Sequence, residues 1–118
     1  MFQSLFGFKK HVDVPQISAQ ELSKRRGGGE SLVLLDVRTS REYELDGHIP
    51  GSRLLPLSSL HQRLEELPKD QTIICICRSG ARSQSACEML ANAGFTNVVN
   101  LRGGIMDWKR NGLPFNQS

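Results

Sequence analysis

A seven-residue stretch, CRSGARS at positions 77–83, carries the side chains best suited to chemistry in this sequence. It places one thiol beside the guanidinium groups of Arg78 and Arg82, among small residues that let the backbone turn tightly. Backbone N–H groups that converge in such a turn form an anion-binding nest, and the start of a following helix adds partial positive charge. All of these features favour a thiolate, so we expect the pKa of Cys77 to lie below that of a free cysteine and its sulfur to act as a nucleophile.

The other two cysteines have simpler interpretations. Cys75 lies inside the apolar run TIICI, and Cys87 lies beside the apolar stripe of a helix-like segment, so we interpret both as core residues. An odd number of cysteines without CxxC spacing argues against a disulfide framework or a zinc site, and the sequence implies no metal and no organic cofactor. Free thiols suit a reducing compartment, which predicts a cytoplasmic protein. A disulfide relay that involves Cys77 stays open as an alternative.

The elements around this stretch alternate between strand and helix. Three apolar runs without polar alternation indicate strands that are buried on both faces, at residues 32–37, 72–76 and 97–101. Weaker strand signals lie at residues 11–16 and 53–56. This order predicts an α/β fold, a parallel sheet with helices on both faces. Ligands of such sheets bind beyond the carboxyl ends of the strands, and Cys77 follows one of those ends.

Helix starts and apolar stripes complete the pattern. Ser18 with Glu21, and Thr39 with Glu42, have the spacing of capping boxes at helix N-termini. One further amphipathic helix is predicted by leucines that recur at spacings of three and four: Leu57, Leu60, Leu64 and Leu67. At 118 residues the chain fits one domain.

Three separated motifs resemble the rhodanese family, the single-domain sulfurtransferases. They are LLDVRTSREYELDGHIPGS at 34–52, CRSGAR at 77–82 and LRGGIMDWKRNGLP at 101–114. The resemblance covers the chain from about residue 14 to residue 114 and implies a rhodanese-like five-stranded parallel sheet. We therefore expect residues 1–11 to be an N-terminal extension and residues 12–118 to be a single rhodanese-like domain.

The resemblance also implies a reaction. In that family a cysteine attacks the outer sulfur of thiosulfate, releases sulfite, and passes the sulfur from a persulfide to cyanide or a thiol. Cys77 takes the place of this nucleophile, which predicts a thiosulfate sulfurtransferase. The substrate-binding loop corresponds to Arg78, Ser79, Gly80, Ala81, Arg82 and Ser83. Some thiosulfate-preferring members have a second basic residue where this chain has Ser79, and Arg82 either compensates for that charge or braces the loop.

The length of the loop separates two chemistries. A related family of cell-cycle phosphatases shares the fold but has one more residue between the cysteine and the arginine. The larger ring fits a phosphate, whereas the smaller ring fits a sulfane sulfur. Four residues separate Cys77 from Arg82 here, which argues against phosphatase and arsenate reductase activity.

Three residues are predicted to support the site. Asp36 and Arg38 end a strand at the same sheet edge as Cys77, and we expect structural roles for both, with Arg38 placed for an ion pair to Glu42. His48 lies in a turn, GHIPGS, where we expect it to hydrogen-bond backbone groups rather than act as a general base.

Charge and hydropathy argue against a nucleic acid as the partner of this protein and against a transmembrane segment. The net charge is only +3 and the basic residues form no long run, which argues against nucleic-acid binding. No apolar run approaches the ~20 residues of a membrane span.

Two alternatives to an enzyme that uses thiosulfate stay open. One is a sulfur carrier that takes persulfide from a partner protein such as a cysteine desulfurase, with the apolar N-terminus as the docking element. The other is a non-catalytic binding module, which the intact cysteine and glycine of the loop disfavour.

Overall fold

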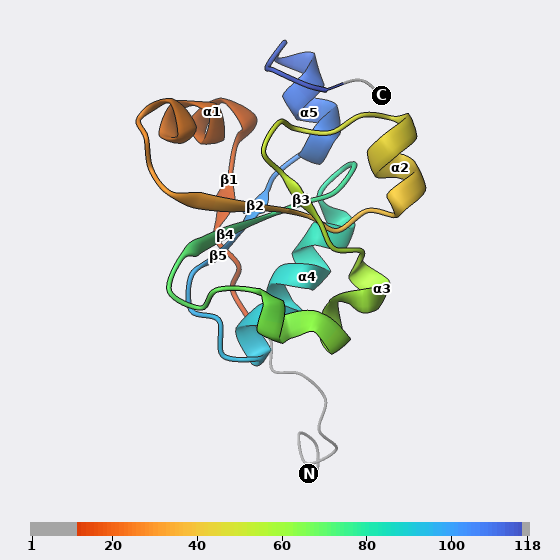
Figure 1. The fold of residues 1–118 in the computed structure, drawn as a ribbon. Coiled ribbons are helices and arrows are strands. Elements are labelled where there is room, and N and C mark those ends of the chain that lie inside the picture. The colour runs from red at the N-terminus through yellow and green to blue at the C-terminus, as the bar shows by residue number, and fades with distance from the viewer. Residues whose placement is uncertain (1–11, 117–118) are drawn as a thin grey trace.

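The computed structural model describes residues 12–116, and within them five strands form one parallel sheet (Figure 1). The strands lie in the order β1-β5-β4-β2-β3. Their bounds are β1 Gln16–Ile17, β2 Leu32–Asp36, β3 Arg53–Leu54, β4 Thr72–Ile76 and β5 Val98–Leu101. Every pair of neighbours is parallel, which confirms the predicted sheet. The predicted boundary after residue 11 coincides with the edge of the described residues and stays a prediction.

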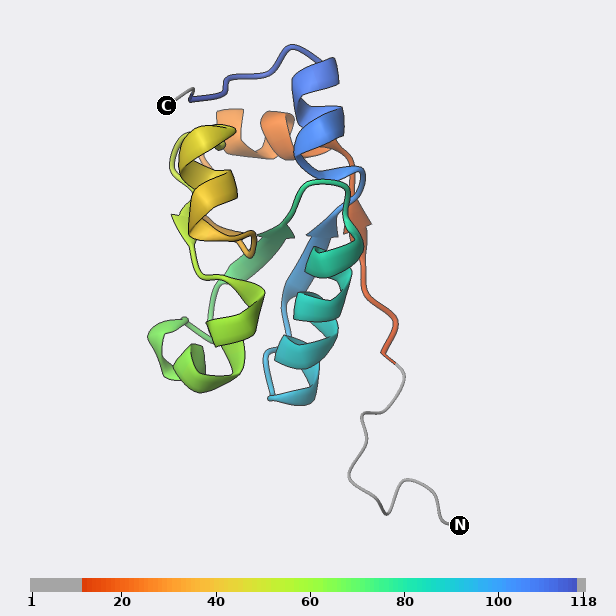
Figure 2. The same ribbon diagram turned by 90° about the vertical axis from the view of Figure 1, so that its right-hand side faces the viewer.

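Helices cover the two faces of the sheet, and their arrangement is visible in two views (Figures 1 and 2). Their bounds are α1 Ala19–Gly27, α2 Ser40–Leu45, α3 Leu57–Leu60, the 3₁₀ helix η2 His61–Glu66, α4 Ala81–Asn92 and α5 Gly104–Arg110. One apolar core lies between the sheet and α1 with α5, and the other lies between the sheet and α3, η2 and α4. Among the helices of residues 12–116, none combines the length and the hydropathy that crossing a membrane requires.

The central strand β4 shows how the sequence fixes these layers. Successive side chains of a strand point to opposite faces of the sheet. Ile73 and Cys75 accordingly pack in the core beneath α4, whereas Ile74 and Ile76 pack in the core beneath α1 and α5. Cys77 continues the first series, so its side chain emerges on the α4 side, where the next helix begins.

The predicted caps are present to different degrees. Thr39 makes the full capping box with Glu42, because each residue's side chain bonds to the other's backbone N–H. Ser18 caps α1 by accepting a hydrogen bond from the backbone N–H of Glu21 at 3.1 Å.

The prediction of one regular helix through the four leucines is wrong. The α-helix α3 ends at Leu60, and η2 continues as a 3₁₀ helix with non-helical backbone at Arg63 (φ −126°, ψ 24°). The four leucines still pack against one core. Leu57 and Leu60 lie in α3, Leu64 lies in η2 and Leu67 follows it, so their spacing marks the face toward the core without requiring one continuous α-helix.

Candidate active site

The loop after β4 and the first turn of α4 wrap around the sulfur of Cys77. The backbone N–H of Gly80 donates a hydrogen bond to Sγ at 3.0 Å, and that of Ser83 donates at 3.3 Å. The Ser83 hydroxyl lies 3.3 Å from the same sulfur. Gly80 has a φ of +107°, a conformation that side-chain-bearing residues rarely adopt, and it immediately precedes α4. The sulfur thus sits at the positive N-terminal end of α4.

The surroundings of Cys77 favour its thiolate although the residue is only 1% exposed. Burial raises the pKa of the thiol, but the Ser83 hydroxyl and the backbone N–H groups of Ser83, Gly80 and Ser79 outweigh burial and lower the pKa below its ordinary value. Within the described residues, the hydrogen bonds to Sγ come from these loop groups and from neither guanidinium group. The thiolate is therefore stabilised by the Ser83 hydroxyl and by the oriented peptide N–H groups of the loop.

The N-terminus of α5 holds the other side of the loop. The backbone N–H of Ile105 donates to the carbonyl of Cys77 at 2.9 Å, and that of Met106 donates to the carbonyl of Arg78 at 3.0 Å. Gly104 makes this approach feasible, because a Cβ there would lie 2.4 Å from the Cys77 oxygen and 2.6 Å from the Arg78 oxygen. These bonds fix the orientation of both peptide planes. Sequence reasoning missed this role, although the glycine pair in LRGGI was its signal.

A buried asparagine on β5 completes the polar surroundings. Asn100 Oδ1 lies 2.5 Å from the Ser83 hydroxyl, and Asn100 Nδ2 donates to the Gly80 carbonyl at 3.2 Å and to Gln16 Oε1 at 2.9 Å. Ser83 has a single hydroxyl proton, so it donates either to Asn100 or to the sulfur at any moment. Sequence reasoning interpreted Asn100 only as part of a strand. Its polar side chain in the otherwise apolar run VVNL was the available signal.

Arg82 braces the loop instead of facing the sulfur. Its guanidinium group makes a two-point ion pair with Glu42, with N–O distances of 2.7 and 2.8 Å. The hydrogen bonds from Arg82, together with that from the Thr39 backbone, lower the pKa of Glu42 to about 2 despite its partial burial. The ion pair joins the N-termini of α2 and α4. This ion pair corresponds to the bracing role that the sequence left open for Arg82, and the role of its charge toward the substrate stays a prediction.

The predicted ion pair between Arg38 and Glu42 is wrong. Arg38 turns back to its own strand and pairs with Asp36, with Nε–Oδ1 and Nη2–Oδ2 distances of 2.9 and 2.7 Å. It also donates to the Gly47 carbonyl at 2.8 Å. Both side chains are buried, and a buried charge is costly unless an opposite charge pairs with it. Asp36 and Arg38, two residues apart, provide that partner for each other. The register pairs Asp36 with Ile76, which places this ion pair beside the start of the loop.

His48 makes backbone contacts, as expected. Its Nδ1 lies 3.0 Å from the Tyr43 carbonyl, and its ring stacks on that of Tyr43 with centroids 3.8 Å apart. Its backbone exchanges two hydrogen bonds with Asn116. Within the described residues, these contacts hold the turn after α2 to the C-terminal segment, and His48 does not contact the sulfur.

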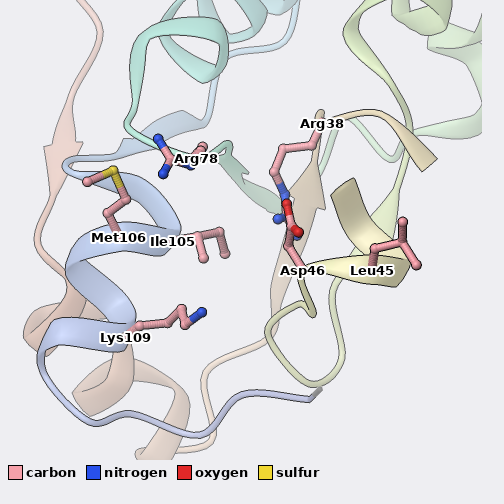
Figure 3. Close-up of a pocket in the computed structure, with 7 residues that line it drawn as sticks. All are labelled: Arg38, Leu45, Asp46, Arg78, Ile105, Met106 and Lys109. Carbon is pink, nitrogen blue, oxygen red and sulfur yellow. The ribbon is translucent and has the colours of Figure 1, made fainter. Parts of the chain in front are cut away.

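A cavity of about 430 Å³ lies beside the loop (Figure 3). Its lining residues are Arg38, Leu45, Asp46, Arg78, Ile105, Met106 and Lys109. Figure 3 shows Ile105 and Lys109 reaching from α5 toward the space that Arg38 and Asp46 border from the opposite side. Of the residues 78–83 that we predicted to bind substrate, Arg78 borders this cavity, while Gly80 and Ser83 contact the sulfur.

A family model, curated proteins and solved structures all match this chain to the same kind of domain. The family model described as Rhodanese-like domain matches residues 18–111. A sulfurtransferase of Allochromatium vinosum is 44% identical over 101 residues, which cover 86% of this chain and 94% of that protein. The crystal structure of a rhodanese-related protein from Thermoplasma volcanium has a TM-score of 0.80 at 32% identity, covering 88% of this chain and 99% of that one. A thiosulfate sulfurtransferase from Pseudomonas aeruginosa has a TM-score of 0.80 at 29% identity, but the match covers 88% of this chain and only 20% of that chain.

Proposed function

The chain belongs to the rhodanese-like sulfurtransferase family, and from this premise we propose that it is a thiosulfate sulfurtransferase with Cys77 as the nucleophile. The observation that supports this most is the ring of donors around Sγ, which consists of the backbone N–H groups of Gly80 and Ser83 and the Ser83 hydroxyl. The thiosulfate sulfurtransferase of Pseudomonas aeruginosa has a similar fold, which makes thiosulfate the first donor to test.

The proposed donor step is a nucleophilic substitution at sulfur. The Cys77 thiolate attacks the outer sulfur of thiosulfate and forms an Sγ–S bond. The S–S bond of thiosulfate breaks, and sulfite leaves with the electron pair of that bond. Arg78, which borders the adjacent cavity, helps bind the anionic donor. The new terminal sulfur is negatively charged, and the same converging N–H groups stabilise it.

The acceptor step reverses this pattern. A thiolate or cyanide attacks the terminal sulfur, a new bond forms to that atom, and the Sγ–S bond breaks with its electron pair returning to Cys77. Because the ring stabilises the thiolate, it also makes Cys77 a good leaving group. Ser79 and Ala81 shape the loop, the Arg82–Glu42 pair joins the start of α4 to α2, and the Asp36–Arg38 pair lies beside the strand end that precedes the loop.

Intact mass measured after incubation with thiosulfate tests this proposal. The protein is expected to gain the mass of one sulfur atom and to lose it on addition of cyanide or a thiol. Cys77→Ser is expected to gain nothing, whereas Cys87→Ala, a control at a buried cysteine on α4, is expected to gain the sulfur. Absence of sulfur on Cys77 with every donor tried would overturn the proposal.

The donor is identified by initial rates with thiosulfate, mercaptopyruvate and a protein persulfide generated by a cysteine desulfurase. We expect the highest kcat/KM with thiosulfate. A preference for the protein persulfide would instead support the sulfur-carrier function. We also propose a cytoplasmic location, because Cys75, Cys77 and Cys87 are free thiols.

A further inference from the structure

The cavity beside Arg78 is larger than the proposed sulfur donor needs. Thiosulfate is a small inorganic ion, whereas clefts of roughly 300–1,000 Å³ typically hold organic ligands. The cavity here is about 430 Å³, and it runs from Arg78, which directly follows Cys77, to Lys109 on α5. It therefore extends from the sulfur-carrying loop to a region that thiosulfate would leave empty.

The lining carries positive charge that the carboxylates of residues 12–116 do not fully neutralise. Three lining residues are cationic and one, Asp46, is acidic. Arg38 is neutralised by the buried carboxylate of Asp36, so the lining keeps a net charge of +1. Within residues 12–116, neither Arg78 nor Lys109 has an ion-pair partner, and the Lys109 ammonium group lies 5.0 Å from the Phe115 ring centroid. Contact with a ring leaves the hydrogen-bonding capacity of the ammonium group available to an anion.

Exposed apolar side chains also line this cavity. The exposed large apolar side chains of the described residues are Leu45, 62% exposed, and Met106, 39% exposed, and both line this cavity. Met106 extends along Arg78 in Figure 3, and Ile105 points into the space between α5 and Asp46. Apolar side chains gathered at one cavity, beside two available cations, indicate a ligand with an organic body and an anionic group.

We propose that this cavity is an acceptor subsite for an organic thiol that carries a carboxylate, and that Lys109 determines this specificity. The body of the thiol packs against Met106 and Ile105, its carboxylate pairs with Lys109, and its sulfur passes Arg78 to reach Cys77. The inference rests on the proposed function and specifies its second substrate. In the transfer, the bound thiolate attacks the terminal sulfur of the Cys77 persulfide, a new S–S bond forms on the thiol, and Cys77 leaves as a thiolate.

Acceptor kinetics with the persulfide-loaded protein test the subsite. The two probes are glutathione, a thiol with carboxylates, and 2-mercaptoethanol, a thiol without charge. For Lys109→Ala, kcat/KM for glutathione is expected to fall roughly fivefold, which corresponds to about 1 kcal/mol for a partly exposed ion pair. The value for 2-mercaptoethanol is expected to change less than about twofold. Comparing each variant with the unmodified protein cancels the different reactivity of the two thiols.

Two further variants separate charge from structure. Lys109→Arg keeps the charge and is expected to restore most of the glutathione rate. Lys69→Ala is the matched control, because Lys69 also lies over a phenylalanine ring, 5.2 Å from the Phe95 centroid, but does not line this cavity. It is expected to leave both acceptor rates unchanged.

Equal losses for glutathione and 2-mercaptoethanol in Lys109→Ala, or no loss for either, would overturn the subsite while leaving the proposed function intact. Failure of the unmodified protein to take up sulfur on Cys77 would instead overturn the proposed function. Intact mass, measured before the acceptor is added, distinguishes the two outcomes.

Discussion

Replacing Gly104 with alanine perturbs the loop without touching a charged or reacting group. At a φ of +57° an alanine costs about 1 kcal/mol relative to glycine. Its Cβ would also lie 2.4 Å from the Cys77 carbonyl oxygen, where ordinary contacts begin at 3.4 Å. Separating these atoms stretches the bonds from Ile105 and Met106 to the loop, each worth about 0.5–1.5 kcal/mol, and overpacking adds about 1 kcal/mol. We expect Gly104→Ala to lower the free energy of unfolding by about 3–5 kcal/mol.

Urea unfolding followed by the fluorescence of the buried Trp108, the single tryptophan of the chain, measures this loss. Gly112→Ala is the control, because Gly112 has a φ of +67° and no atom within 4 Å of an added Cβ. It is expected to cost about 1 kcal/mol, so the difference between the variants isolates the clash with the loop. Equal losses in both variants would refute the idea that α5 holds the loop through Gly104.

Two further predictions concern the ionisable groups. Ser83→Ala is expected to raise the pKa of Cys77, because it removes a hydrogen bond to the charged sulfur that is worth about 1.5 kcal/mol. The thiolate then appears only at higher pH, and the pH profile of alkylation by iodoacetamide should move upward, whereas an unmoved profile would show that the hydroxyl serves Asn100 alone. Glu42→Gln is expected to lower the free energy of unfolding at pH 7 by about 1 kcal/mol, a value reduced for the partial exposure of the pair with Arg82. Since the pKa of Glu42 is lowered from 4.5 to about 2, its stabilisation is complete above pH 4.5 and is lost as the pH falls toward about 2. Urea titrations across this range should show the two proteins converging, and a constant difference would contradict the ion-pair explanation.

Sequence patterns predicted the sheet because its strands are unusually distinct. The runs that became β2, β4 and β5 are apolar on both faces, which separates them from the amphipathic helices between them. The same order placed Cys77 at the carboxyl end of a strand and before a helix, and the structure places it there. Thr39 and Glu42 were identifiable as a cap because their interaction spans only three residues.

The contacts that the sequence did not reveal join residues far apart in the chain. Glu42 and Arg82 are separated by 40 positions, and Ser83 and Asn100 by 17. Sequence spacing within one helical turn predicts an ion pair between Arg38 and Glu42. In the structure Arg38 is buried beside Asp36 and forms its ion pair there. Local pattern therefore identified the nucleophile candidate, and tertiary packing determined which groups surround it.

The peptide groups of the loop that contains Ser79 are polarised from one face of the loop to the other. The two faces of the loop are used in opposite ways, since its carbonyls at Cys77 and Arg78 accept hydrogen bonds from α5 while its N–H groups at Gly80 and Ser83 donate to the sulfur. The N-termini of α4 and α5 thus meet the same loop, one through the sulfur and one through the carbonyls. Stabilisation of an anionic sulfur then depends on the orientation of peptide groups, which a charge at position 79 would supplement but not replace.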